Sequence, residues 1–203
     1  MSAIQPADRA ADVPPAVPRG AAWILLVAGA MGVFGTFVQT LEKIRILERP
    51  GEALWCDRGS ALSCTSVLKA WQSSALGVPN SMVGLVVFGF FLTAGVALVL
   101  RSRPSVAFLG VVQFFALFML GFTLWYLWQT TFVLGSLCVY CILNGTAVVV
   151  ANLAAPRLLV GAGRLQGDGV VGFVRRAVQD GVDAWFWLAL WAGVAVTMWA
   201  VLS

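Results

Sequence analysis

Long apolar runs alternate with short polar segments along this chain of 203 residues. Each run is close to the roughly 20 residues that a helix needs to cross the hydrocarbon core of a bilayer. A helix satisfies its own backbone hydrogen bonds, so it is the form that such runs take in lipid. The pattern predicts an all-α membrane protein: a four-helix transmembrane bundle plus a fifth C-terminal transmembrane helix. The expected spans are residues 21–40, 81–100, 106–129, 137–155 and 184–202.

The polar segments divide the chain into four parts. Residues 1–20 are polar and rich in proline, which predicts a disordered N-terminal tail. Residues 21–155 form the four-helix bundle, with one long polar outer loop at 41–79. A basic, glycine-rich linker follows at 156–183, and the fifth transmembrane helix covers 184–203.

Two local patterns add detail to this outline. In the first run a small residue recurs at every fourth position, at Ala28, Gly32 and Thr36, which favours close packing against another helix in lipid. In the outer loop, Val67, Leu68, Trp71 and Ala75 fall on one face of a short helix expected over residues 65–76.

Composition and charge support a membrane protein and exclude other classes. Hydrophobic residues make up 60% of the chain and charged residues 11%, against roughly half and a quarter in soluble domains. The net charge is +4, but the basic residues are scattered through short connections, so no nucleic-acid footprint is expected. A transporter is disfavoured because the strongly polar residues within the spans, namely Gln39, Gln113, Asn144 and Asn152, are not ionisable.

The positive-inside rule predicts the orientation of the helices. Eight lysines and arginines fall on the side of the N-terminus and five on the opposite side. We therefore expect the N-terminus inside and the loop at 41–79 outside. No C-terminal retention signal is present, which favours the plasma membrane of a bacterium over the endoplasmic reticulum.

The candidate chemistry rests on four cysteines, since the chain has no histidine. Cys138 and Cys141 form a C-x-x-C at the start of a helix, where the helix dipole and free N–H groups favour a thiolate. The alternative is a pair of buried apolar cysteines. Cys56 and Cys64 lie in the outer loop, either as a structural disulfide or as a second redox pair. The spacing of the four is unsuited to zinc, and no metal site is expected.

At these residues the chain resembles the vitamin K epoxide reductase family. The matching elements are the Cys56–Cys64 loop, the run GVPNSMVG at residues 77–84, and the C-x-x-C at 138–141, within residues 23–155. The resemblance implies a four-helix bundle around a quinone. It implies that Cys138 and Cys141 are the active-site pair, with Cys141 nearer the quinone, and that Cys56 and Cys64 form a shuttle pair.

The resemblance also suggests residues that hold the quinone. At the position of Asn80 the family donates a hydrogen bond to a quinone carbonyl; the alternative for Asn80 is an N-cap. Many members carry an aromatic residue one turn after the active-site pair, whereas this chain has the run Ile142–Gly145. Asn144 is then the candidate for the second contact, and a looser pocket is the alternative.

These observations predict a membrane thiol–quinone oxidoreductase. It would reoxidise a thioredoxin-like, disulfide-forming partner, a separate periplasmic or extracellular oxidase, and pass the electrons to menaquinone or ubiquinone. We expect Cys64 to contact Cys138 and Cys56 to meet the partner, although the reverse order stays open. The alternative is a non-enzymatic membrane protein in which the disulfides only brace the loop.

Overall fold

A computed structural model describes residues 17–59, 61–163, 165 and 167–202 of the protein. Within these residues the chain forms helices and no strands, and five of the helices are long and apolar enough to cross a membrane. This confirms the predicted all-α membrane protein. The five are α1 (Arg19–Glu48), α3 (Asn80–Val99), α4 (Val106–Trp128), α5 (Val139–Gly161) and α7 (Val182–Leu202). A π-helical turn, η3 (Gln129–Val133), extends α4.

Two helices run further than the apolar runs suggest. Helix α1 continues through residues 41–48, which were expected in the outer loop, because this segment consists of good helix formers and Pro50 is the first residue that stops it. Helix α5 passes through Pro156 and ends at Gly161, beyond the expected limit at residue 155. The first 16 residues of the expected tail lie outside the described residues, and Arg19 and Gly20 already belong to α1.

The expected linker at 156–183 also contains a helix, α6 (Val170–Gln179). Its apolar side chains include Val170 and Phe173, both largely exposed, while Arg175 and Arg176 give it a basic side. Such a pattern is typical of helices that lie on a membrane surface. Arg157 of α5 forms an ion pair with Asp183 (2.6 Å), which ties the start of α7 to the bundle.

The loop helix is shorter than predicted. Helix α2 (Cys64–Lys69) begins after Ser63, whose hydroxyl accepts a hydrogen bond from the Ser66 N–H at 3.2 Å. Ala70 is extended, and a single 3-10 turn, η2 (Trp71–Ser74), follows. The break turns Trp71 away from the buried face that holds Val67 and Leu68, so its side chain is exposed. The prediction of one continuous face was wrong because the helix is interrupted at Ala70.

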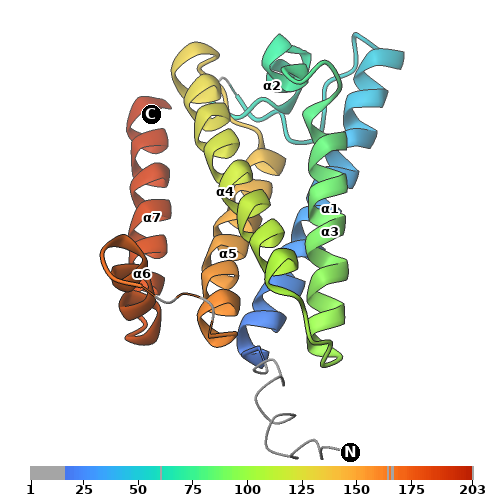
Figure 1. Cartoon of the computed structure of the whole chain (residues 1–203). Helices are drawn as coiled ribbons and strands as arrows, with labels where there is room; N and C mark the ends of the chain where they lie inside the picture. Colours follow the sequence, from blue (N-terminus) through green and yellow to red (C-terminus); the bar gives the residue numbers. More distant parts are fainter. Residues whose placement is uncertain (1–16, 60, 164, 166, 203) are drawn as a thin grey trace, which may run out of the picture.

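The helices α1, α3, α4 and α5 form the bundle, and α7 stands beside it (Figure 1). The loop containing α2 covers the end of the bundle where α1 and α4 finish and where α3 and α5 begin (Figure 1). Helix α6 lies near the opposite end. The C-x-x-C at the start of α5 and the loop cysteines are therefore at the same end of the protein.

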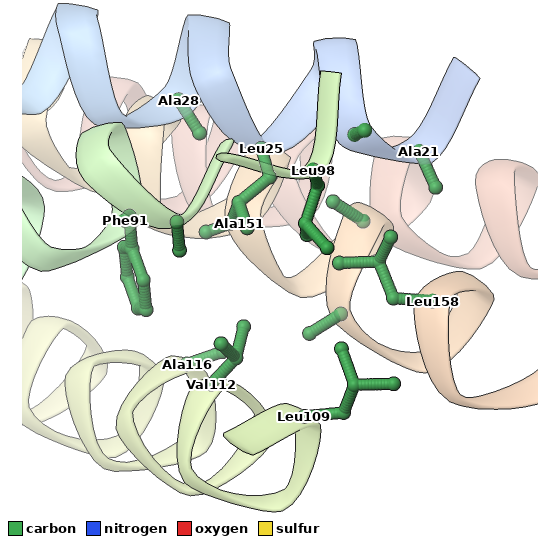
Figure 2. Packing of buried hydrophobic residues seen from close by; sticks show 14 of the residues in the cluster. Ala21, Leu25, Ala28, Phe91, Leu98, Leu109, Val112, Ala116, Ala151 and Leu158 are labelled. Carbon is green, nitrogen blue, oxygen red and sulfur yellow. The ribbon is translucent and has the colours of Figure 1, made fainter. Parts of the chain in front are cut away.

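The apolar core fills the half of the bundle away from this loop, and Figure 2 shows how its side chains pack. Side chains from all four helices meet there, including Leu25, Phe91, Leu109 and Leu158. The small residues of α1 lie at helix contacts, as predicted: Ala28 and Thr36 are buried, and a Cβ added at Gly32 would lie 2.1 Å from the Phe88 ring. In lipid, such close packing is a main source of helix association.

Candidate active site

All four cysteines belong to one buried cluster under the outer loop. Cys56, Cys64 and Cys138 are at most 1% exposed, and Cys141 is 8% exposed. The side chains that surround them come from the loop and from the ends of three bundle helices; they are Ile46, Leu54, Val67, Leu68, Tyr126 and Tyr140. The fold thus brings two cysteine pairs, separated by more than 70 residues in sequence, into one water-excluded cluster.

The two pairs are in different redox states. Cys56 and Cys64 form a disulfide with a Cα–Cα distance of 5.9 Å. Cys138 and Cys141 are free thiols. Because thiol–disulfide exchange needs a free thiol beside a disulfide, this arrangement contains both reactants of an exchange reaction.

A short backbone ladder sets the relative position of the two pairs. The Ser63 N–H donates to the Leu137 carbonyl (3.0 Å), and the Leu137 N–H donates to the Ala61 carbonyl (2.8 Å). The ladder is a parallel bridge between Leu62 and Leu137. Cys64 follows the bridge by two residues in one segment, and Cys138 follows it by one residue in the other. The bridge therefore holds the segment that carries Cys64 next to the segment that carries Cys138.

Asp57 organises the loop around the disulfide. Its carboxylate accepts hydrogen bonds from the N–H groups of Leu54 (2.9 Å) and Thr65 (3.0 Å), and from the hydroxyls of Ser63 (3.1 Å) and Thr65 (2.5 Å). Burial raises the pKa of Asp57, but these hydrogen bonds outweigh it and hold the pKa below its usual value. The carboxylate thus joins the two sides of the loop next to Cys56 and Cys64.

Replacement of Asp57 by asparagine is expected to loosen the loop at neutral pH. Because the pKa of Asp57 is lower in the folded loop, its stabilising effect is present above the ordinary pKa and is lost as the pH falls through the lowered value. In Asp57→Asn, amide hydrogen exchange at Leu54 and Thr65 should be several-fold faster at pH 7, and the difference should shrink in acid.

Glu52→Gln is the matched control for this prediction. Glu52 pairs with Arg45 and Arg49, but the partners are exposed, and such pairs contribute little stability. An equal change in exchange for the two variants, or a difference that persists at acid pH, would contradict the role assigned to Asp57.

A second contact joins the loop to the C-x-x-C. The Trp55 indole donates a hydrogen bond to the Tyr140 hydroxyl at 2.6 Å, and the two rings meet edge to face with centroids 6.1 Å apart. Trp55 precedes Cys56 and Tyr140 precedes Cys141 in sequence. This contact fixes the Cys56 side of the loop over the first turn of α5.

The local geometry of the C-x-x-C favours Cys138 as the more acidic thiol. Cys138 is the N-cap of α5, and the Cys141 N–H donates to its carbonyl at 3.0 Å. A hydrogen bond from the Cys141 thiol, assisted by the backbone N–H groups of Cys141 and Tyr140, lowers the pKa of Cys138, although burial opposes this. A lowered pKa makes Cys138 a good leaving group in thiol–disulfide exchange.

A cavity lies beneath the C-x-x-C between the four bundle helices. Its wall is mainly apolar, and Cys141 lines it whereas Cys138 does not. The polar groups on the wall are few and face a largely hydrocarbon surface, which is typical of a site for a flat apolar ligand with a few polar atoms. The aromatic and aliphatic lining residues include Phe88, Met119, Phe122, Leu127 and Val148, and the polar ones include Gln39, Asn80, Tyr126 and Asn144.

Both predicted ligand-binding asparagines line this cavity. Asn80 donates from Nδ2 to the Gln72 carbonyl (2.6 Å), and Asn144 donates from Nδ2 to Gln39 Oε1 (2.9 Å). The two Oδ1 atoms are buried and find no hydrogen-bond partner among the described residues. The N-cap of α3 is Pro79, so Asn80 does not cap the helix.

Three further residues at the site were not identified from the sequence. Gln39 donates from Nε2 to the Cys141 sulfur at 3.6 Å, and the buried Tyr126 hydroxyl lies beside the same sulfur. Trp191 of α7 covers Gly145, where an added Cβ would lie 2.5 Å from its ring. The amide of Gln39 in an apolar run was a usable signal, but Trp191 meets α5 only through the tertiary fold.

Comparison with known proteins identifies the family of this chain. A search of curated proteins found no match. The vitamin K epoxide reductase family, however, matches residues 23–155, a region that contains α3 and α4, most of α1 and α5, the outer loop and the four cysteines. The family resemblance noted in the sequence is thereby confirmed, and the chain belongs to the vitamin K epoxide reductase family.

Proposed function

We propose that this protein is a membrane thiol–quinone oxidoreductase that reoxidises a thioredoxin-like, disulfide-forming partner. Electrons pass from the partner to Cys56 and Cys64, then to Cys138 and Cys141, and finally to a membrane quinone. Family membership implies a quinone-linked disulfide oxidoreductase. The observation that carries the proposal is the buried cluster in which a disulfide lies against a free C-x-x-C that borders a cavity.

The transfer between the pairs is a balanced thiol–disulfide exchange. The Cys64 thiolate attacks Cys138 in an oxidised Cys138–Cys141 pair, which forms a Cys64–Cys138 disulfide and releases the Cys141 thiolate. The Cys56 thiolate then attacks Cys64, which restores the loop disulfide and leaves Cys138 reduced. The state in the structure, with a loop disulfide and two free thiols, corresponds to the product of this transfer.

The lining of the cavity suits the quinone that the family implies. Its apolar wall suits a flat ring and a hydrocarbon tail, and the unpartnered Oδ1 atoms of Asn80 and Asn144, which accept hydrogen bonds, suit the hydroxyls of the reduced quinol. When bound, the quinone supplies the capacity to accept two electrons and two protons. Asn80 and Asn144 would accept hydrogen bonds from the hydroxyls of the quinol, and Phe88 and Phe122 would border the ring. The lining position of Cys141 supports it as the cysteine next to the quinone.

The proposed orientation places the cysteine cluster on the outer face of a bacterial plasma membrane. The amphipathic, basic helix α6 lies toward the end opposite the loop (Figure 1), and more of the lysines and arginines belong to that side. This distribution supports an inner location for the α6 end. An oxidising outer compartment is also where a disulfide-forming partner operates.

Turnover by the purified protein in detergent tests this function. Dithiothreitol serves as donor and ubiquinone-1 or menadione as acceptor, and quinol formation is followed by absorbance. Because dithiothreitol reduces quinones slowly by itself, Cys138→Ala/Cys141→Ala defines the background. We expect the wild type to exceed this background clearly with one of the two quinones. A rate equal to the background, together with a loop disulfide that resists dithiothreitol, would leave only a structural role for the cysteines.

A further inference from the structure

Two amides form a directed hydrogen-bond chain that ends on the Cys141 sulfur. Asn144 Nδ2 donates to Gln39 Oε1 at 2.9 Å, and Gln39 Nε2 donates to Cys141 Sγ at 3.6 Å. The donors therefore run in one direction, from Asn144 to Gln39 and from Gln39 to the sulfur. Gln39 comes from α1, whereas Asn144 and Cys141 lie one turn apart on α5, so the chain crosses between the two helices and returns.

The burial of these two amides in an apolar span costs free energy unless hydrogen bonds compensate for it. Gln39 is 8% exposed and lies in the membrane-spanning part of α1. A buried amide loses its hydration and needs hydrogen-bond partners in return. Its two partners are the Cys141 sulfur and the Asn144 amide, and both Gln39 and Asn144 border the cavity. The amide is therefore placed on a reacting atom rather than on the backbone.

Packing against α1 holds Asn144 in place. A Cβ added at Gly35 would lie 2.2 Å from Asn144 Oδ1, so the amide rests directly on the helix backbone at this glycine. Gly35 is one turn before Gln39 on α1. The same absence of a side chain that lets Asn144 approach α1 also brings its Nδ2 to Gln39.

The direction of the chain matters because Gln39 has a donor end and an acceptor end. An N–H directed at sulfur favours the thiolate, whereas a carbonyl oxygen directed at sulfur favours the protonated thiol. The two ends exchange by a half-turn of the amide. The Asn144 N–H on Oε1 fixes Gln39 with its N–H toward Cys141.

We propose that Gln39 is the hydrogen-bond donor to the Cys141 sulfur during the redox reaction, and that Asn144 is a positioning residue that orients Gln39. The identity of Cys141 as the quinone-facing thiol rests on the proposed function. The hydrogen bonds themselves do not depend on it. In this assignment the main role of Asn144 is exerted through Gln39, and its Oδ1 has no hydrogen-bond partner among the described residues.

The test measures how easily Cys141 becomes a thiolate, without any quinone. In a Cys138→Ala background with the loop disulfide intact, the rate of Cys141 modification by methyl methanethiosulfonate is measured from pH 6 to pH 11. A variant that only changes access alters the plateau rate, while a variant that changes thiolate formation moves the midpoint of the profile. We expect Gln39→Met to move the midpoint upward by about one pH unit, and Asn144→Leu by a smaller amount.

Asn152→Leu is the matched control. Asn152 is a buried amide on the same helix, but it donates to the Ala116 and Val148 carbonyls and not toward a cysteine. Its midpoint should stay unchanged. Asn144→Leu retains both Gln39 and the Cys141 sulfur. It therefore provides a second test of the proposal if Gln39→Met does not fold.

Midpoints for Gln39→Met and Asn144→Leu that equal the control would overturn the proposal. This outcome is distinguishable from failure of the proposed function. Loss of quinone turnover in the wild type with shifted midpoints would contradict the oxidoreductase alone. Normal turnover with unshifted midpoints would contradict the role of the two amides alone.

Discussion

Replacement of Cys141 by alanine is expected to abolish quinone reduction with every electron donor, a loss of at least about a thousandfold. Cys141 is the only one of the four cysteines that lines the cavity. Without it, Cys138 has no neighbour on α5 with which to form a disulfide, so the pair cannot deliver two electrons. The measurement is steady-state quinol formation with dithiothreitol and with a reduced thioredoxin-like protein.

The controls for Cys141→Ala separate chemistry from folding. The thermal stability of the variant in detergent should stay close to that of the wild type, because the substitution removes a single sulfur atom that lines a cavity. Turnover within tenfold of the wild type in a folded Cys141→Ala protein would show that another residue delivers electrons to the quinone.

Replacement of Cys64 by alanine is expected to affect turnover differently with the two electron donors, the thioredoxin-like protein and dithiothreitol. Turnover with the protein donor should fall to background, because the loop pair can no longer form its disulfide or attack Cys138. Turnover with dithiothreitol should persist. Cys138 is fully buried under the loop in the wild type, and loss of the Cys56–Cys64 disulfide frees the loop that covers it.

Cys56→Ala is the companion variant, since it also removes the disulfide but leaves Cys64 next to the Leu62–Leu137 bridge. We expect it to accumulate a Cys64–Cys138 disulfide, detectable as a linked peptide by mass spectrometry without reduction. If the linked peptide instead joins Cys56 and Cys138 in Cys64→Ala, the order of the two loop cysteines is the reverse of the one proposed.

Much of the fold could be predicted because each membrane span corresponds to one unbroken apolar run in the sequence. The ends of helices were harder to predict. Residues 41–48 are polar enough to suggest a loop, yet nothing in them stops a helix before Pro50. The interruption at Ala70 and the exposure of Trp71 depend on how the loop packs over the bundle, which periodicity alone does not reveal.

The candidate site also contains residues that the sequence predicts and residues that only the fold brings together. The C-x-x-C is a local pattern, and its position at the start of a helix could be read directly from the chain. The partners of Cys141 could not, because Gln39 and Tyr126 come from α1 and α4 and meet the sulfur only in the folded bundle. Trp191 belongs to α7, outside the region that matches the family, and reaches α5 through packing at Gly145.

The central claim is that both cysteine pairs feed electrons to one quinone site. It is tested most directly by an anaerobic single-turnover experiment. The protein is fully reduced, freed of reductant, and mixed with excess ubiquinone-1, and the quinol formed per protein is counted. Since each dithiol yields two electrons, the account predicts about two quinols for the wild type, about one for Cys56→Ala/Cys64→Ala, and none for Cys141→Ala. One quinol for the wild type would show that the loop pair does not pass electrons to the quinone site. No quinol at all would contradict the proposed oxidoreductase activity.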